Sequence, residues 1–387
     1  METALFDYEL PESCIARTPT ARREDSKLLV VRRDSGEVSH CVFRDLPELL
    51  PAGTVLFRND ARVLRARLHG RLPNGGRVEC LLLRPREESS SAAEKSPQGK
   101  FTPDPESRQW WCLLKPGKKV SGLGEFFVDG IYRVELVGRN EAEFLVRFFL
   151  PDGMTVSSLA EAVGRLPLPP YIERARKKDD KNTTDAMEAY AKLDGERYQT
   201  IYADTQRAVA AAAPTAGLHF SEEVLGALAM RGMPCFNLTL HVGLGTFQPV
   251  KSETIEGHSI HGEYYEIPAA TCAALTLAKG RRLAVGTTSL RAMEDFARKQ
   301  AVNRVPLGLN SAYSTEAKLF VYPPAVFSGA DLLLTNFHLP RSTLMCLVAA
   351  FLTPGSTSGI AWLKALYAEA ISRRYRFYSY GDAMLIL

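Results

Sequence analysis

The sequence lacks the features of secreted, membrane-spanning and repetitive proteins. Its longest apolar stretch, Leu344–Leu352, is about half of the ~20 residues that a helix needs to cross a bilayer. The amino terminus carries Glu2 and Asp7 where a signal peptide carries basic residues, and no apolar run follows them. No internal repeat is apparent. We therefore expect a soluble, cytoplasmic protein without membrane association.

Closely spaced cysteines and a strong charge imbalance are also missing. The seven cysteines stand singly, without the close pairs of a zinc ribbon or a CxxC redox motif, which is typical of reduced thiols in a cytosol. Lys and Arg exceed Asp and Glu by only 48 − 44 = 4. This mild excess permits binding to a polyanion but does not demand it.

The length predicts more than one domain. With 387 residues, the chain exceeds the ~250–300 at which a single hydrophobic core stops growing. Hydrophobic residues make up 45% and charged residues 24%, as in average globular proteins, which excludes wholesale disorder and coiled coil.

A strand-rich segment is expected between residues 66 and 150. Short β-prone runs such as VECLLL and YRVELV are separated there by Asn-Gly-Gly, Pro-Gly and Asp-Gly turns, which predicts a small antiparallel β-barrel. A Ser-, Pro- and charge-rich stretch, residues 87–108, interrupts it and is predicted to be a disordered surface loop. A second charged stretch, residues 174–196, is predicted to be an inserted loop or a short exposed helix.

The rest of the chain, residues 1–65 and 151–387, alternates strands with helices after residue 210. Ser221 is a plausible helix N-cap and Gly232 a C-cap glycine, and three strand-to-helix units follow. The strands are expected at residues 236–241, 283–285 and 331–334, and helices at 222–231, 269–279, 290–299 and 343–352. This alternation predicts a large α/β domain, barrel-like with a partly parallel sheet, interrupted by the small β-barrel domain.

Polar loops follow these strands. They comprise residues 214–220, 241–249, 286–289, 335–340 and 378–382. Because ligands of α/β sheets bind at the carboxyl ends of the strands, we expect the loops to form one site. Singly, each has a structural alternative: Thr288 or Ser289 can cap a helix whose free amides can also hold an anion, and His219, His241 and His338 can be structural histidines. Gly243-x-Gly245 lacks the third glycine of a dinucleotide fingerprint.

Three further patterns leave alternatives open. The spacing His258-x-x-His261-x-Glu263 resembles a metal site, but no third strong ligand is nearby, so we favour acid-base or hydrogen-bonding roles and expect no metal. The segment Arg373–Tyr378 alternates charge with aromatic rings, which suits RNA phosphates and bases or a packed terminal strand. Arginines are dense in the amino-terminal part, which predicts either a solvated basic surface or a contact with RNA. They are Arg17, Arg22, Arg23, Arg32, Arg33, Arg44, Arg58, Arg62, Arg65, Arg67 and Arg71.

Several sequence blocks together resemble a known family. They are FDYELPES near the amino terminus, FRNDARV at residues 57–63, LPPYI at 168–172, YQTIYA at 198–203, AAPTAGLHF at 212–220, TLHVGLGTFQPV at 239–250, VGTTSLRAMED at 285–295, TNFHLPRSTL at 335–344 and YSYGDAMLI at 378–386. The chain is similar across almost its whole length to the S-adenosylmethionine:tRNA ribosyltransferase-isomerases of queuosine biosynthesis. Lys27 stands where that family usually has arginine, and Arg207-Ala208 where glycine is common.

The resemblance implies a reaction and two substrates. The ribosyl unit of S-adenosylmethionine, a co-substrate and not a permanently bound cofactor, would be transferred to 7-aminomethyl-7-deazaguanine in a tRNA anticodon and isomerised. Epoxyqueuosine would form in the tRNA, and adenine and methionine would be released. The family also has a large α/β domain interrupted by a small β-barrel. We expect the protein to act as a monomer.

The chemistry of such a reaction suggests roles for the loop residues. Removal of the acidic 5′ proton beside the sulfonium needs a base, for which His219, His241 and His261 are eligible with Glu263 or Asp382, and the choice stays open. Asp382 or Asn336 could stabilise the leaving adenine. The remaining assignments place Tyr171, Phe220 or Tyr380 at the cationic sulfur, Gly286, Thr287, Thr288, Ser289 and Arg291 at the methionine carboxylate, and Arg23 and Arg62 at the tRNA.

Three rival functions remain at this stage. An S-adenosylmethionine-dependent tRNA methyltransferase would use the same co-substrate but leave S-adenosylhomocysteine. A non-catalytic RNA-binding protein would use the β-barrel as its contact. A hydrolase would need Ser289 or Ser342 as nucleophile, and neither lies in a GxSxG elbow.

Overall fold

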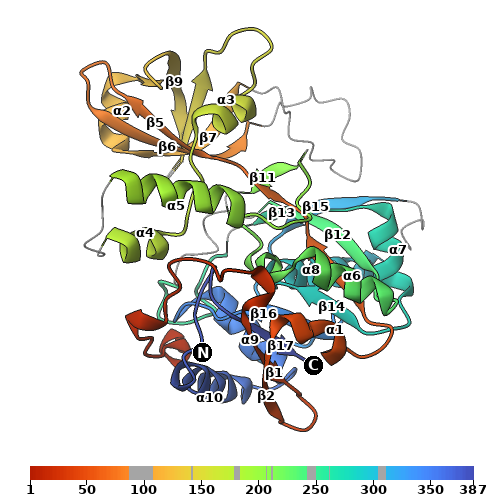
Figure 1. Ribbon diagram of the computed structural model, residues 1–387. Helices are drawn as coiled ribbons and strands as arrows, with labels where there is room; N and C mark the ends of the chain where they lie inside the picture. Colours follow the sequence, from red (N-terminus) through yellow and green to blue (C-terminus); the bar gives the residue numbers. More distant parts are fainter. Residues whose placement is uncertain are drawn as a thin grey trace.

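The computed structural model describes residues 1–86, 108–140, 143–177, 184–205, 207–210, 212–241, 250–260, 262–303 and 311–387. It consists of an α/β body and a smaller β-barrel, with two helices lying between them (Figure 1). Within the described ranges, no helix combines the length and the apolar character needed to cross a membrane. All seven cysteines are free.

The α/β body is built on a mixed sheet of nine strands in the order β15-β13-β12-β3-β14-β16-β17-β1-β2. The central strands β12, β3, β14 and β16 are parallel to one another, and β1 is parallel to β17. The remaining pairs of the sheet are antiparallel. The partly parallel sheet expected from the sequence is therefore confirmed. In the described part of the chain, β15 and β2 are the two edges of this nine-stranded sheet, so it does not close into a barrel. Only the smaller sheet is closed. The strands are β1 (Lys27–Val31), β2 (Val38–Val42), β3 (Val55–Asn59), β12 (Cys235–Leu240), β13 (Glu263–Ile267), β14 (Arg282–Val285), β15 (Tyr313–Ala317), β16 (Leu332–Asn336) and β17 (Ala383–Ile386).

Both faces of the sheet are buried, which explains the continuous apolar runs of its strands. In β1, Leu28 and Val30 point to one hydrophobic cluster, whereas Leu29 and Val31 point to the other. Helices α1 (Leu46–Leu49) and α6 (Glu222–Met230) cover the first face, and α7 (Ala269–Leu277), α8 (Thr287–Asn303), α9 (Thr343–Leu352) and α10 (Gly359–Ser372) contribute to the second. The predicted start of α6 is confirmed, since Ser221 Oγ accepts a hydrogen bond from the backbone N–H of Val224.

The smaller sheet is a closed antiparallel barrel in the order β10-β7-β6-β5-β8-β9, as the turn spacing predicted. Its strands are β5 (Arg67–Arg71), β6 (Arg77–Pro85), β7 (Gln109–Lys115), β8 (Glu125–Val128), β9 (Tyr132–Arg139) and β10 (Phe144–Phe148), with α2 (Gly117–Leu123) beside them. Helix α3 (Val156–Val163) follows the last strand and buries Val156, Leu159 and Ala160 in the hydrophobic core of the barrel.

Two helices and a short sheet lie between the barrel and the body (Figure 1). Part of the charged stretch 174–196 forms α4 (Pro170–Lys177) and α5 (Thr184–Arg197), joined by the buried ion pair between Arg176 and Asp194. Strand β4 (Arg62–Val63) pairs in parallel with β11 (Ala208–Ala210). Residues 178–183 and 87–107 of the two predicted loops lie outside the described residues. The short 3₁₀ helices are η1 (Thr3–Phe6), η2 (Glu12–Cys14), η3 (Arg23–Asp25), η4 (Phe43–Asp45) and η5 (Thr215–His219).

Candidate functional site

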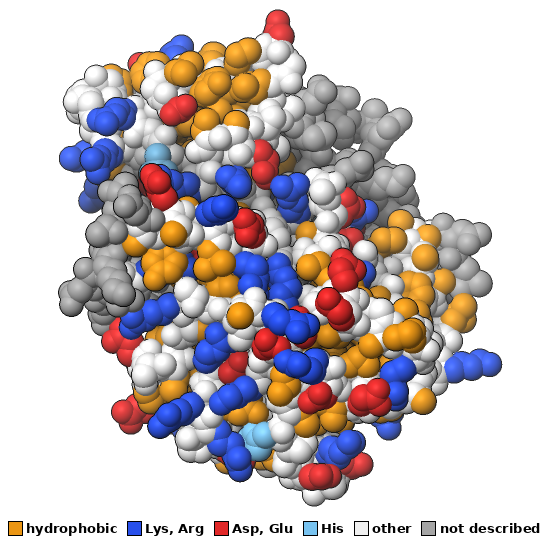
Figure 2. All heavy atoms as spheres, viewed as in Figure 1, with side chains coloured by type: hydrophobic (Ala, Val, Ile, Leu, Met, Phe, Trp, Pro, Cys, Tyr) orange, Lys and Arg blue, Asp and Glu red, His pale blue; other side chains and the backbone are white. Residues whose placement is uncertain are grey.

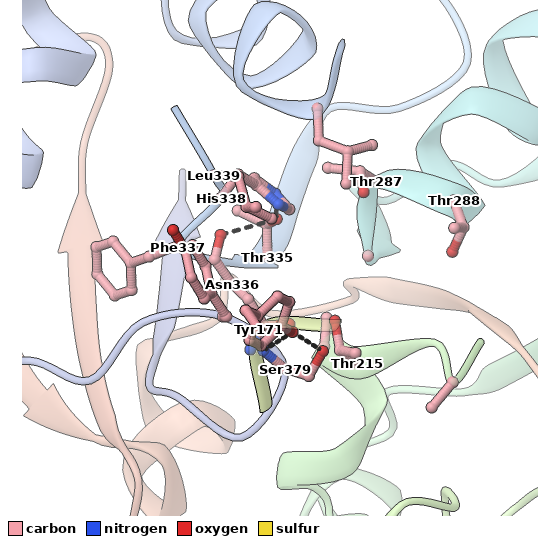
Figure 3. Close-up of a pocket in the computed structure, with 15 residues that line it drawn as sticks. Tyr171, Thr215, Thr287, Thr288, Thr335, Asn336, Phe337, His338, Leu339 and Ser379 are labelled. Carbon is pink, nitrogen blue, oxygen red and sulfur yellow. Dashed lines mark hydrogen bonds between the residues drawn. The ribbon is translucent and has the colours of Figure 1, made fainter. Parts of the chain in front are cut away.

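A pocket opens at the carboxyl ends of β14 and β16, as expected for an α/β sheet. Four of the five polar loops predicted from the sequence contribute to its wall (Figure 3). The pocket is partly open to solvent, and its empty space of about 540 Å³ includes part of that solvent. It is lined by Tyr171, Ala213, Thr215, Ala216, Gly286, Thr287, Thr288, Thr335, Asn336, Phe337, His338, Leu339, Leu344, Tyr378 and Ser379. None of these lining residues is Asp, Glu, Lys or Arg.

One wall is the start of helix α8. Gly286 connects β14 to this helix with a φ of +91°, and its N–H donates to the carbonyl of Leu334 at 2.7 Å. Thr287 and Thr288 begin the helix and lie across the pocket from Thr335 and Asn336 (Figure 3). The first-turn amides of a helix have no partners within the helix, so this wall offers hydrogen-bond donors suited to an anion.

The opposite wall follows strand β16 and contains an immobilised histidine. The Nε2 atom of His338 lies 2.8 Å from Thr335 Oγ1. The hydroxyl of Tyr367 accepts a hydrogen bond from the His338 backbone N–H, and the hydroxyl of Tyr8 donates to the His338 carbonyl. Burial lowers the pKa of His338 to about 3, so its imidazole is neutral at physiological pH.

Asn336 forms the floor between the two walls. Its Nδ2 lies 2.9 Å from Nε2 of His219 and 3.3 Å from the backbone carbonyl of Asp382. Its Oδ1 is buried and has no hydrogen-bond partner among the residues that the structure describes. An unsatisfied buried carbonyl oxygen costs free energy, so this atom is suited to accept a hydrogen bond from a ligand.

Aromatic rings form the remaining side. The hydroxyl of Tyr171 hydrogen-bonds with Ser379 Oγ and accepts from the Ser379 backbone N–H at 3.0 Å (Figure 3). The rings of Tyr171 and Tyr378 lie 4.5 Å apart between centroids. Burial raises the pKa of both phenols, so both stay neutral. Neutral aromatic rings can accommodate a cationic group by a cation–π contact.

Five of the predicted site residues line the pocket, and two stand directly behind it. Tyr171, Gly286, Thr287, Thr288 and Asn336 belong to the wall. His219 and Asp382 both contact Asn336 from behind. The Asp382 carboxylate accepts hydrogen bonds from the backbone N–H groups of Lys27 and Arg376, so it fixes the chain around the site.

Other predicted site residues have their contacts elsewhere. Phe220 packs against the rings of Phe43 and Tyr202. Ser289 Oγ donates to the carbonyl of Val285, and Tyr380 donates its hydroxyl hydrogen to Asp194. His241 Nε2 lies 3.7 Å from a carboxylate oxygen of Glu266.

The expected role of Arg291 at a ligand carboxylate does not match its placement. Its guanidinium donates to Glu263 Oε2 at 2.6 Å and to the carbonyls of Leu319 and Ala317, all outside the pocket wall. Glu263, expected as an orienting carboxylate, is consequently one half of this buried ion pair.

The His258, His261 and Glu263 pattern is not helical where it is described. His258 lies in an irregular segment with its ring against Phe320, Glu263 begins strand β13, and His261 lies outside the described residues. Across the described ranges, no group of three or more His, Cys, Asp or Glu side chains is placed to hold a metal.

The two predicted tRNA arginines differ in environment. Arg23 is partly buried and donates to the carbonyls of Leu218 and Glu196, which makes it a structural cross-link. Arg62 is about one-third exposed and lies 3.5 Å from Glu161. On the face shown in Figure 2, Lys and Arg side chains are interspersed with acidic ones over both the barrel and the body. The aromatic rings of Tyr375 and Phe377 are buried in the core of the α/β body, whereas the largely buried ring of Tyr378 lines the pocket.

Five polar lining residues were given no ligand role from the sequence: Thr215, Thr335, His338, Tyr378 and Ser379. All five lie in loops that the sequence singled out. The polar loop composition therefore located the pocket, whereas the direction of each side chain depends on contacts between segments distant in sequence.

Comparisons with known proteins cover the whole chain. Residues 3–386 match the family model described as "Queuosine biosynthesis protein". The chain is 43% identical over 389 residues to the S-adenosylmethionine:tRNA ribosyltransferase-isomerase of Gloeobacter violaceus, covering 100% of this chain and 96% of that protein. It is 38% identical over 390 residues to the enzyme of the same name from Thermotoga maritima, with full coverage of both. A crystal structure titled S-adenosylmethionine tRNA ribosyltransferase from Thermotoga maritima aligns with 30% identity and a TM-score of 0.49, covering 99% of this chain and 100% of that one.

Proposed function

Since the chain belongs to the queuosine biosynthesis protein family, we propose that it is an S-adenosylmethionine:tRNA ribosyltransferase-isomerase. It transfers and isomerises the ribosyl moiety of S-adenosylmethionine onto 7-aminomethyl-7-deazaguanine in the tRNA anticodon, which yields epoxyqueuosine and releases adenine and methionine. The observation that carries this proposal is the full-length similarity to proteins of that name. The uncharged pocket at the strand ends, which combines apolar and aromatic surface with a few hydroxyl and amide groups, supports it independently.

The pocket chemistry fits the sulfonium substrate. S-adenosylmethionine carries a cationic sulfur, an ammonium and a carboxylate, so a wall without Lys or Arg avoids repelling its net positive charge. The amides and hydroxyls of Gly286, Thr287 and Thr288 at the start of α8 are proposed to bind the carboxylate. The rings of Tyr171 and Tyr378 are proposed to face the sulfur.

The candidates for the base fall into two groups. His219 and Asp382 are proposed as positioning groups, because both act on Asn336 from behind the wall. Removal of the 5′ proton is assigned to His241 or His261, because a pKa of about 3 makes the pocket-lining His338 a weak base. Exchange of solvent deuterium into the 5′ position, measured for a glutamine variant of each histidine, identifies the base as the one whose loss abolishes exchange.

The tRNA is proposed to bind near the junction of the barrel and the body. Arg62 is proposed to contact the tRNA there. The exposed Arg65 lies beside Arg62, since both side chains approach Glu161 within 3.8 Å. Arg23 is proposed to support this surface indirectly through its bonds to backbone carbonyls. We further propose that the protein acts in the cytoplasm as a monomer and holds no cofactor permanently, and light scattering of the purified protein tests the monomer.

The decisive experiment follows the labelled ribose. The protein is incubated with S-adenosylmethionine labelled in its ribose carbons and with tRNA carrying 7-aminomethyl-7-deazaguanine, and the tRNA nucleosides are analysed by mass spectrometry. The expected result is labelled epoxyqueuosine together with free adenine and methionine. S-adenosylhomocysteine with a methylated tRNA would instead identify a methyltransferase. Unmodified tRNA is the control and should remain unlabelled.

A further inference from the structure

Three buried side chains form a hydrogen-bonded chain that ends in the pocket. Ser26, His219 and Asn336 are each at most 3% exposed and come from segments far apart in the sequence. Ser26 Oγ lies 2.9 Å from His219 Nδ1, and His219 Nε2 lies 2.9 Å from Asn336 Nδ2. The first two of these residues do not line the pocket, but Asn336 does.

Two backbone carbonyls, one at each end of this series of hydrogen bonds, determine which atom donates in every bond. The backbone carbonyl of Asp382 can only accept, so the atom of Asn336 that faces it at 3.3 Å must be Nδ2. The carbonyl of Arg23 likewise can only accept, so the hydroxyl of Ser26 donates to it at 3.0 Å. Ser26 Oγ then accepts from Nδ1–H of His219, and Nε2 of His219 accepts from Asn336 Nδ2.

The surroundings of His219 preserve this arrangement. Its ring packs against the ring of Phe43 at a centroid distance of 5.1 Å. Burial, with Arg376 and Arg23 nearby, lowers the pKa of His219 to about 3. A protonated imidazole would turn Nε2 into a donor that faces the Nδ2 donor of Asn336, so the neutral state matches the geometry.

The consequence concerns the other end of the Asn336 amide. With Nδ2 held by two acceptors, rotation of the amide by half a turn would place Oδ1 against both of them. Oδ1 is therefore held away from both acceptors; it is buried and without a partner among the described residues, and Asn336 itself lines the pocket. An acceptor of this kind selects a ligand that brings a hydrogen-bond donor.

We infer that Ser26 and His219 are positioning residues that orient the Asn336 carboxamide as a hydrogen-bond acceptor for a hydroxyl or amino donor on the nucleoside part of the substrate. The inference rests on the proposed function, which supplies S-adenosylmethionine as the ligand. The donors of the nucleoside part are the two ribose hydroxyls and the adenine amino group, and Asn336 accepts from one of them.

Binding of matched analogues tests the inference without tRNA or turnover. Isothermal titration compares S-adenosylmethionine with its 2′-deoxy, its 3′-deoxy and its 6-deamino (purine) analogue, each of which lacks one donor. Wild-type protein is expected to bind one of the three about 10-fold more weakly than the parent, as the loss of one hydrogen bond to a buried acceptor predicts. That analogue identifies the donor.

The variants then separate positioning from simple structural support. Asn336→Leu and His219→Leu should bind the parent and the identified analogue equally, whereas His219→Gln, which can accept from Asn336 and donate to Ser26, should restore the discrimination. Ser26→Ala should reduce it. Ser221→Ala, which removes a buried hydroxyl at the N-cap of α6, is the matched control and should discriminate like wild type.

The outcomes distinguish this inference from the function on which it rests. Full discrimination in Asn336→Leu or in a folded His219→Leu would overturn the inference, as would a wild-type protein that binds all four compounds equally. In both cases turnover of the labelled substrate would still support the proposed function. If His219→Leu does not fold, Ser26→Ala and His219→Gln decide the matter.

Discussion

Two buried neutral histidines make the fold sensitive to acid. Burial lowers the pKa of both His219 and His338 to about 3, whereas an unfolded histidine titrates near 6.5. Between these values the unfolded chain binds more protons, so stability is present above about pH 6.5 and is lost as the pH falls toward 3. Each histidine contributes a slope of at most about 1.4 kcal/mol per pH unit.

Urea unfolding at several pH values between 4.5 and 7.5 measures this slope. Replacing either histidine with glutamine should make the stability less dependent on pH over this range, and replacing both should reduce the slope further. Carboxylates contribute to the acid limb in every variant, so the difference between variant and wild type is the relevant quantity. A double variant with the slope of wild type would show that the folded state lowers the pKa of neither histidine.

Arg62 provides a second test at the scale of a residue. Its side chain is about one-third exposed and its nearest carboxylate, on Glu161, is 3.5 Å away, a distance at which an exposed ion pair contributes little stability. Arg62→Ala should therefore weaken tRNA binding and lower the slope of log K against log salt by about one. Binding of S-adenosylmethionine should not change. Arg133→Ala, on the barrel strand β9 and paired with Glu125, is a matched control.

At the scale of elements, the sequence predicted what local pattern determines. The apolar runs of β14 and β16, both predicted as strands, reflect burial on both faces of the sheet. Ser221 caps its helix through a contact three residues away. Arg291 shows the limit. Its position in the first turns of α8 predicted that it binds a ligand in the pocket. Its guanidinium instead donates to Glu263 and to two carbonyls at the end of β15 and just after it. Such contacts between distant segments cannot be read from local pattern.

Gly286 is the element-scale position where the backbone itself shapes the pocket. Its φ of +91° lies in the region that favours glycine, and a Cβ there would have ordinary contacts, at 3.5 Å from Thr288 and 3.6 Å from Ala216. Gly286→Ala should therefore be destabilising through backbone strain alone, by about 1–2 kcal/mol. It should also weaken S-adenosylmethionine binding, because the turn places the first amides of α8.

Denaturant unfolding and titration calorimetry measure the two effects separately. Gly232→Ala is the matched control, since its φ is +69°, no atom would lie within 4 Å of its Cβ, and it follows α6 outside the pocket. It should lose similar stability and keep binding. Equal binding losses in both variants would contradict the role of Gly286 in the site.

At the scale of the whole molecule, the sequence located the β-barrel, but its boundary depends on packing. The strand pattern suggested residues 66–150, yet the barrel core also contains Val156, Leu159 and Ala160 of α3. Arg67 and Arg165 exchange two backbone hydrogen bonds, at 3.0 and 2.9 Å, which close the segment near its ends. Helix α3 carries no strand signal, so only the three-dimensional contacts assign it to the barrel. We therefore propose that the inserted domain extends to about residue 165.

Two excised fragments test this boundary. A fragment of residues 64–165 should fold cooperatively, whereas a fragment of residues 66–150 should be less stable by about 3–6 kcal/mol, because it loses the burial of Val156 and Leu159 against the barrel core. Since small domains are stable by only about 5–15 kcal/mol, the shorter fragment should be marginal. Circular dichroism during thermal unfolding measures both. Equal stability of the two fragments would place α3 with the α/β body, and the barrel would then end where its last strand ends.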